Sequence, residues 1–111
     1  MREKPVVRRR QANEDIDSAI NYYWHEAGAD LALAFTNELE KVIRRISKQP
    51  GAGSPRFVHE VGIPALRHAA MGRFPYLIFY LENESRIEVL RVLHSKMDIP
   101  SWLDESYLGE Q

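Results

Sequence analysis

Apolar residues recur along this chain with two different periods, and the change of period divides it into a helical half and a strand half. From residue 13 to residue 48 the apolar positions follow one another three and four residues apart, which is helical spacing. From residue 65 to residue 94 they lie in short runs, some alternating with polar residues and some continuously apolar. The first half therefore predicts helices, and the second half predicts strands.

Two helices are predicted in the first half, with a short connection at Gly28. Asn13 is a suitable N-cap for the first helix, and acidic residues follow it in the first turn, where the helix dipole favours negative charge. Asp30 can cap the second helix, which ends where Pro50 and Gly51 interrupt the pattern. Because the connection at Gly28 is only a few residues long, we expect the two helices to form an antiparallel hairpin.

Four strands are predicted around this hairpin. A short apolar stretch within residues 5–10 predicts the first strand, and residues 65–71 predict the second. Residues 76–82 and 86–93 are the most apolar, and the sequence ENESR between them predicts a β-hairpin turn. The order indicates an α+β fold with an N-terminal strand, an antiparallel helical hairpin and three C-terminal antiparallel strands. We expect the helices on one face of an antiparallel sheet, and the other face to be wet or to bind a partner.

The composition is that of one small soluble domain. The chain has 111 residues, 44% of them hydrophobic, and no cysteine, which excludes disulfides and thiolate metal sites. No apolar run is long enough to span a membrane, and no hydrophobic stretch follows the basic N-terminus as in a secretion signal. We expect a single domain over residues 1–111, with a core at about 5–103 and an acidic tail at 104–111, located in the cytoplasm and without cofactors.

Charge is balanced overall but unevenly placed. The net charge is -1, five basic residues lie within residues 1–10, and four acidic residues and no basic residue lie within residues 98–111. A near-neutral total argues against a protein that depends on many phosphate contacts. The consecutive arginines at residues 8–10 are interpreted in two ways: they contact nucleic acid or an acidic partner, or they point outward from an edge strand and discourage strand aggregation.

Three residues suit chemistry on a phosphate: Arg67, Arg91 and His94. Arginines can hold a scissile phosphate bidentately, and a histidine can donate or accept a proton near neutral pH, which together suit RNA cleavage. Strict alternation points Arg91 and His94 to opposite sheet faces, so only a bulge or the strand end lets them converge. The structural alternative is that Arg91 pairs with Glu82 or Glu88 and His94 caps a backbone carbonyl. No sequence motif for a metal site is present.

A second group of residues suits the binding of a protein partner. The three consecutive aromatic residues at 22–24 cannot all face one side of a helix, so at least one is exposed or contacts a partner. The strand at 86–93 is apolar on both faces, and a helical hairpin covers only one of them. A partner that adds a strand or an amphipathic helix would complete the burial. The predicted partner-binding residues are Tyr22, Trp24, Leu90 and Val92.

These segments, in this order, resemble the RelE/ParE toxin superfamily over about residues 5–103. The likeness runs from DIDSAINYYWHEAG through LALAFTNELEKVIRRISKQPGAGSPR and ALRHAAMGRFPYLIFY to LRVLHSKMDIP. The GSPR loop together with YLIFY and LRVLH is most similar to the ParE branch. The resemblance implies a toxin of a bacterial type II toxin–antitoxin pair. It also implies that the predicted partner is a cognate antitoxin, which holds the toxin inactive by wrapping over the helical hairpin and the sheet.

The resemblance implies one of two targets. ParE-type members poison DNA gyrase, whereas RelE-type members cut mRNA in the ribosome, and the three candidate residues match functional positions of that nuclease branch. RelE-type nucleases are strongly basic, whereas this chain has one basic residue, Arg56, between residues 49 and 66. We therefore expect a non-enzymatic toxin that poisons gyrase. The alternatives are a ribosome-dependent mRNA endonuclease and a non-toxic homologue that still binds an antitoxin.

Overall fold

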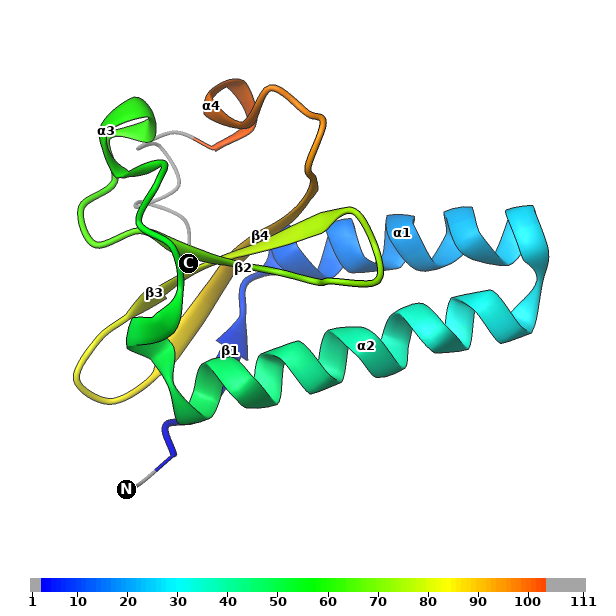
Figure 1. Cartoon of the computed structure of the whole chain (residues 1–111), viewed down its shortest axis with the longest axis horizontal. Helices are drawn as coiled ribbons and strands as arrows, with labels where there is room; N and C mark the ends of the chain where they lie inside the picture. The colour runs from blue at the N-terminus through cyan, green and yellow to red at the C-terminus, as the bar shows by residue number, and fades with distance from the viewer. Residues whose placement is uncertain (1–2, 104–111) are drawn as a thin grey trace.

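Two long helices, α1 (Arg10–Ala27) and α2 (Ala29–Lys48), form the antiparallel hairpin that the apolar spacing predicts (Figure 1). The computed structural model describes residues 3–103 of the chain. Gly28 alone separates the helices, with a φ of 84°, a conformation that L side chains rarely adopt. The amide of Gly28 donates to the carbonyl of Trp24 at 2.8 Å and closes the last turn of α1. The tip of the hairpin extends well beyond the sheet, so its distal half is covered on fewer sides.

Both helices begin earlier than their predicted caps. The carbonyl of Arg9 accepts the amide of Asn13 at 3.1 Å, which closes the first turn of α1. Asn13 therefore lies inside the helix. Asp30 lies in the first turn of α2 instead of capping it, because Gly28 occupies the N-cap position. The predicted caps were therefore wrong at both positions, although the acidic side chain of Asp30 still lies where the helix dipole favours it.

The sheet contains β1 (Val6–Arg8), β2 (Arg67–Ala70), β3 (Tyr76–Glu82) and β4 (Ile87–His94) in the order β1–β4–β3–β2. The pairs β2–β3 and β3–β4 are antiparallel, as predicted, and the α+β class is confirmed. β1 pairs with β4 in parallel, so the expectation of a wholly antiparallel sheet was wrong at this edge. A parallel pair needs a long crossover, and the helical hairpin with the two intervening strands supplies it.

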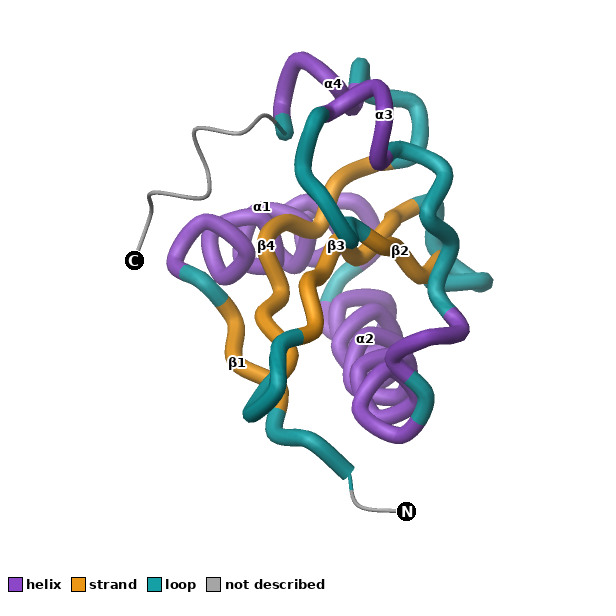
Figure 2. The backbone as a smooth tube through the Cα atoms, turned by 90° about the vertical axis from the view of Figure 1, so that its left-hand side faces the viewer, coloured by secondary structure: helices purple, strands orange, loops and turns teal. Residues whose placement is uncertain are grey.

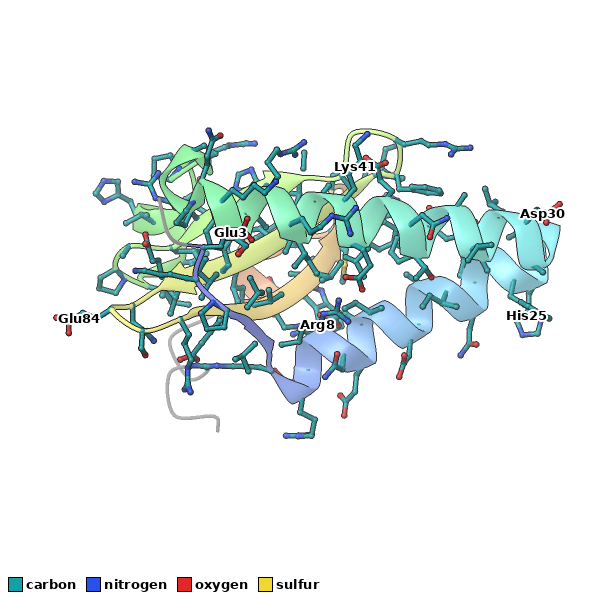
Figure 3. All side chains as sticks on the ribbon, turned by 90° about the horizontal axis from the view of Figure 1, so that it is seen from below. Glu3, Arg8, His25, Asp30, Lys41 and Glu84 are labelled. Carbon is teal, nitrogen blue, oxygen red and sulfur yellow. The ribbon has the colours of Figure 1, made fainter. Side chains whose placement is uncertain are left out.

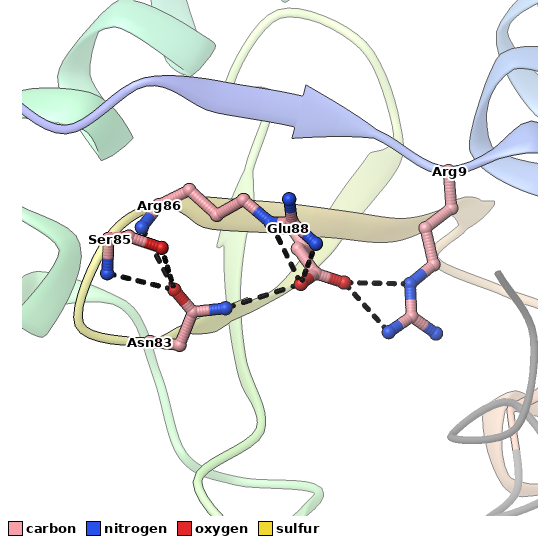
Figure 4. A network of polar contacts seen from close by, with 5 residues as sticks. All are labelled: Arg9, Asn83, Ser85, Arg86 and Glu88. Atoms are coloured by element: carbon pink, nitrogen blue, oxygen red, sulfur yellow. Dashed lines mark hydrogen bonds and ion pairs between the residues drawn. The ribbon is translucent and has the colours of Figure 1, made fainter.

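The predicted turn between β3 and β4 is held by one asparagine and tied to the start of α1 by one glutamate (Figure 4). The Oδ1 atom of Asn83 accepts the amides of Ser85 at 3.1 Å and Arg86 at 2.9 Å. Its Nδ2 atom donates to Glu88 at 3.2 Å. Glu88 also accepts hydrogen bonds from Nε and Nη2 of Arg9, at 3.0 and 2.7 Å, which joins the start of α1 to the hairpin turn.

The helical hairpin covers one face of the sheet and forms the larger core with it. The side of α1 that carries Ile16 and the side of α2 that carries Phe35 and Leu39 pack against Ile78 of β3 and Val89 of β4. All five side chains are at most 5% exposed. Burial of side chains of this size stabilises a fold by about 1.5–3 kcal/mol each, so this layer fixes the position of the hairpin on the sheet.

The other face of the sheet is covered by the chain itself, so the expectation of a wet or partner-bound face was wrong. Two short helices, α3 (Val58–Val61) and α4 (Ile99–Trp102), lie next to each other on this side (Figure 2). They were not predicted as helices, because four residues are too few to show a helical period. The second core that they complete consists of Phe57, Val61, Ile63, Leu66, Phe79, Leu90, Leu93, Ile99 and Leu103.

The C-terminal end of the described chain and the lengths of its helices bear on two further predictions. The acidic tail predicted at 104–111 lies outside the described residues. Before it, Pro100 stands in the first turn of α4, a position where proline is compatible with a helix. Among residues 3–103, no helix is both long and apolar enough to cross a membrane.

Candidate functional site

Two of the predicted chemical residues line one hollow beside β4, a strand that contains a bulge. Phe79 pairs with Arg91 but the next residue of β3, Tyr80, pairs with Val89, so Leu90 is an extra residue in β4. An extra residue resets the alternation of side chains beyond it. Arg91 and His94 both lie beyond the extra residue, in regular register with Phe79 and Tyr76, so the bulge does not change their positions relative to each other. Both nevertheless line a hollow of about 270 Å³ between α1, β4 and α4, beside the part of β4 that β1 does not pair with.

Arg91 is a structural anchor of this hollow. Its side chain is 9% exposed, and its Nε and Nη2 atoms donate to the two carboxylate oxygens of Asp15 in α1, at 2.6 and 2.8 Å. Its Nη1 atom donates to the carbonyl of Trp102 in α4 at 3.1 Å. Asp15 also accepts the backbone amide of Val92 at 3.0 Å. The predicted carboxylate partners, Glu82 and Glu88, were wrong, because α1 crosses β4 here and supplies a closer carboxylate.

His94 lies at the end of β4 with one ring nitrogen engaged. Its Nδ1 atom accepts the backbone amide of Lys96 at 3.1 Å, so a neutral His94 carries its proton on Nε2. The predicted bond to a backbone carbonyl was therefore wrong, since the nitrogen accepts where it was expected to donate. The ring packs edge-on against that of Tyr76, with centroids 5.3 Å apart. Nε2 is the atom through which His94 can act on a bound group.

Arg67 is not part of this hollow. It lies in β2, and its Nη1 atom donates to the carbonyl of Gly53 at 2.6 Å, which fastens the loop before β2 to the sheet. In the sheet register Arg67 is opposite Tyr80, whereas His94 is opposite Tyr76. Four residues of β3 separate these two positions, about 13 Å along a strand. The structure therefore brings together two of the three residues that would suit RNA cleavage, and places the third elsewhere.

The walls of the hollow are aromatic. Tyr22 of α1, Tyr76 of β3 and Trp102 of α4 all line it. Burial, followed by the neighbouring hydroxyls of Tyr23 and Tyr22 and the carboxylate of Asp15, raises the pKa of Tyr76 above its usual value. The Tyr76 hydroxyl is therefore neutral near pH 7 and able to donate a hydrogen bond. Aromatic walls with a few hydrogen-bonding groups suit the insertion of a side chain from a bound peptide.

Sequence reasoning missed Asp15, Tyr76 and Trp102 as parts of this site. One signal for Asp15 was present: it lies three residues after Ala12 and four before Ala19, both buried, so it is an acidic residue on the apolar side of α1. The acidic residues of this segment were interpreted only as partners of the helix dipole. A carboxylate on a buried side needs a partner, and that requirement pointed to an arginine such as Arg91.

The predicted partner-binding residues fall into two groups. Tyr22 and Trp24 are 55% and 54% exposed, on the half of α1 that leads to the hairpin tip. Leu90 and Val92 are 0% and 2% exposed, one in each core. A partner cannot reach Leu90 in this structure, whereas Val92 borders the hollow beside Arg91. The cover of α3 and α4 buries Leu90, and the helical hairpin buries Val92. An exposed residue that sequence reasoning missed is Leu33 of α2, at 59%.

A second hollow, of about 340 Å³, lies beside the loop at residues 50–54. The loop begins with one turn of 3₁₀-helix, Pro50–Ala52. The Tyr80 hydroxyl donates to the carbonyl of Pro50 at 2.6 Å and lies against Gly53.

Burial, with a smaller contribution from the charge of Arg56, lowers the pKa of His68, which packs between two phenylalanine rings on the other sheet face. No group of three metal-ligating side chains occurs within residues 3–103.

Comparison with known proteins places these features in one family. The family model described as the ParE toxin of the type II toxin–antitoxin system parDE matches residues 6–99. A solved structure titled "Chromosomal ParDE TA system from P. aeruginosa" is similar in fold, with a TM-score of 0.71 and 20% sequence identity. The match covers 85% of this chain and 98% of that chain. No curated protein matches the chain at a significant level.

Proposed function

The chain belongs to the ParE toxin family of type II toxin–antitoxin systems, and we propose that it arrests growth by binding and poisoning DNA gyrase, with no enzymatic activity of its own. The pairing of Arg91 with Asp15 supports a binding toxin over a nuclease. A buried guanidinium that is bidentate to a carboxylate is not presented to a scissile phosphate. A net charge of -1 supports the same choice, because a nuclease that grips RNA gains from excess positive charge.

One observation favours a second candidate function, cleavage of mRNA in the ribosome. Arg91 and His94 line the same hollow, and a histidine with an available Nε2 atom is a competent acid or base near neutral pH. In this reading the Asp15 pair would have to open so that Arg91 reached a phosphate. The position of Arg67, about 13 Å away along the sheet, would leave it outside the reaction.

We further propose that a cognate antitoxin neutralises the toxin by wrapping over the distal half of α1, where Tyr22 and Trp24, about 200° apart around the helix, are exposed on two different flanks. Tyr22 and Trp24 present large aromatic groups, the type of residue that dominates the binding energy of protein interfaces. Trp102, 49% exposed, lines the same hollow as Tyr22 and continues the Tyr22 flank of this surface onto α4. An antitoxin segment that laid one side chain into the hollow would contact α1, β3 and α4 together. Val92 borders this hollow, whereas Leu90 is not part of the proposed surface.

The target is tested by timed induction of this chain alone in a bacterial host, with labelled thymidine and labelled methionine followed in parallel. We expect DNA synthesis to fall first, and purified chain to inhibit gyrase in a supercoiling assay. Earlier loss of protein synthesis, abolished by His94→Ala with the fold retained, would favour the mRNA nuclease. Unchanged growth in a host whose gyrase resembles the natural target would indicate a non-toxic homologue that keeps only antitoxin binding.

A further inference from the structure

The C-terminal half of α2 carries a face of positive charge that the fold does not use. Four exposed side chains, spaced three and four residues apart, lie on one side of the helix, and we call them the cationic face: Lys41, Arg44, Arg45 and Lys48. With Gln49 they line a hollow of about 410 Å³. Lys41 lies on the side of α2 that is turned away from α1 (Figure 3).

The cationic face has no partner within the described chain. None of its four side chains makes an ion pair or a hydrogen bond with another of residues 3–103. The arginines at residues 8–10, in contrast, are each paired with a glutamate. Glu3 shares a neighbouring hollow with Arg44 but forms no ion pair with it. The overall charge of -1 therefore conceals a local cluster of four unneutralised cations.

The fold gains too little from this cluster to explain it. Cations stabilise the C-terminal end of a helix through its dipole, but that effect is confined to the last turn, which contains Arg45 and Lys48. Lys41 and Arg44 lie before that turn. Like charges three and four residues apart also repel one another on a helix. A cluster that costs the isolated helix stability is expected where an anionic partner removes the repulsion.

We propose that the cationic face binds the phosphodiester backbone of a nucleic acid duplex. From Lys41 to Lys48 the helix advances about 10 Å, and a DNA duplex of that length carries about six phosphates. Two of the four side chains are arginines, which bind phosphate oxygens bidentately. The match is one of charge density, and it requires no particular base sequence.

An acidic polypeptide is the competing anion, and the surroundings of the face speak against it. Protein interfaces have an apolar, aromatic centre, whereas the hollow on this face is lined by five polar residues. The exposed large hydrophobic residues among residues 3–103 all lie outside it: Val7, Tyr22, Trp24, Leu33 and Trp102. A surface with cations and no apolar anchor suits a phosphate backbone. The inference is separate from the choice of gyrase or ribosome as target.

The test is fluorescence anisotropy of labelled DNA and RNA duplexes of about 20 base pairs, one sequence in both chemistries, titrated with the full chain between about 50 and 200 mM salt. The double variant Arg44→Gln/Lys48→Gln removes two contacts. It should reduce the slope of log K against log salt by about 1.8 for DNA. Arg73→Gln/Lys96→Gln, which removes two exposed cations elsewhere, is the matched control and should leave the slope unchanged.

Each outcome decides the proposal. Thermal melts establish that the variants fold, and if the double variant does not, Lys41→Gln alone should reduce the slope by about 0.9. Binding of the DNA duplex alone or of the RNA duplex alone supports the phosphodiester proposal and identifies which nucleic acid the cationic face binds. Equal slopes for the cationic-face variant and its control would overturn the proposal. Displacement of the duplex by polyglutamate as readily as by unlabelled duplex would also overturn it, in favour of an acidic polypeptide.

Discussion

Asp15 and Arg91 are 76 residues apart in the sequence and form a bidentate ion pair across the interface of α1 and β4. The pair is nearly buried, with side-chain exposures of 14% and 9%. Asp15 satisfies the guanidinium and the amide of Val92 together, and Arg91 reaches on to α4 through the carbonyl of Trp102. The two residues therefore join the helical hairpin, the bulged strand and α4 at one point, beside the candidate site.

Replacement of Asp15 tests this junction. Asp15→Ala leaves a buried guanidinium and a backbone amide without their acceptor, and we expect a loss of about 3–5 kcal/mol in the free energy of unfolding. Urea denaturation measures the loss. Asp17→Ala, an exposed acidic residue on the same helix, is the matched control and should change stability by less than about 0.5 kcal/mol. Equal effects of the two substitutions would mean that the pair contributes nothing specific.

Glu88 makes the stability of the fold depend on pH, with stability decreasing as the pH falls. Hydrogen bonds from Arg9 lower the pKa of Glu88 below 4.5, with Arg86 adding to the effect and burial opposing it. A carboxyl group with a depressed folded-state pKa stabilises the fold above its unfolded pKa, and the contribution is lost as pH falls through the folded value. We therefore expect Glu88→Gln to cost about 1–2 kcal/mol near neutral pH.

The measurement is the difference in unfolding free energy between the natural chain and Glu88→Gln, followed from about pH 6 down to about pH 3. The difference should shrink as pH falls below about 4.5, because Glu88 is then protonated in the unfolded state before it is protonated in the folded state, and it is lost once the folded carboxyl group is protonated as well. Glu84→Gln, at an exposed position of the same turn, is the control and should show no such trend. A difference for Glu88→Gln that stays constant over this range would contradict the role of Arg9.

Substitution by alanine at Gly53 and at Gly51, two residues apart in one loop, should have opposite effects on stability. A Cβ atom at Gly53 would lie 2.1 Å from the Tyr80 hydroxyl, which would have to leave the carbonyl of Pro50. We expect Gly53→Ala to destabilise the chain by about 1–3 kcal/mol. At Gly51 nothing lies within 4 Å, so Gly51→Ala should be neutral or stabilise by up to about 1 kcal/mol. Thermal melts of the two variants side by side check the contrast, and equal melting temperatures would refute it.

Long elements with a regular apolar pattern, and strands joined by a clear turn, were predictable from the sequence. A one-residue bulge and a pairing between strands far apart in the sequence were not. Strand β3 was predicted at its observed bounds, and β4 within one residue, because ENESR marks the turn between two apolar runs. The bulge at Leu90 has no local signal, since neither glycine nor proline marks it and the residues around it are apolar on both sides. The parallel pairing of β1 depends on a crossover of the whole chain, which a local pattern does not show.

The candidate site was predictable in its residue types more than in its geometry. Arg91 was singled out because a charged residue within an apolar strand needs a function or a partner. Its partner was sought among glutamates close in the sequence, and Asp15 was missed because only the three-dimensional crossing of α1 over β4 brings it near. Similarly, Leu90 looked available only because the four-residue helices that cover its face show no period in the sequence.

The last prediction concerns the affinity of the antitoxin for the exposed aromatic residues of α1. If the antitoxin wraps over both exposed flanks of α1, Tyr22→Ala and Trp24→Ala should each lower its affinity by about 2 kcal/mol, or roughly 30-fold, as loss of an aromatic anchor does in other interfaces. Isothermal titration of a synthetic antitoxin C-terminal peptide measures the change. Val7→Ala, at another exposed apolar residue, on the edge strand β1, is the control for general surface effects. Leu90→Ala should lower stability, because Leu90 is buried away from the hollow, while the folded protein keeps its affinity. Wild-type affinity in both aromatic variants, with the Leu90 variant weakened, would instead place the antitoxin on the sheet and require the face of β4 to open.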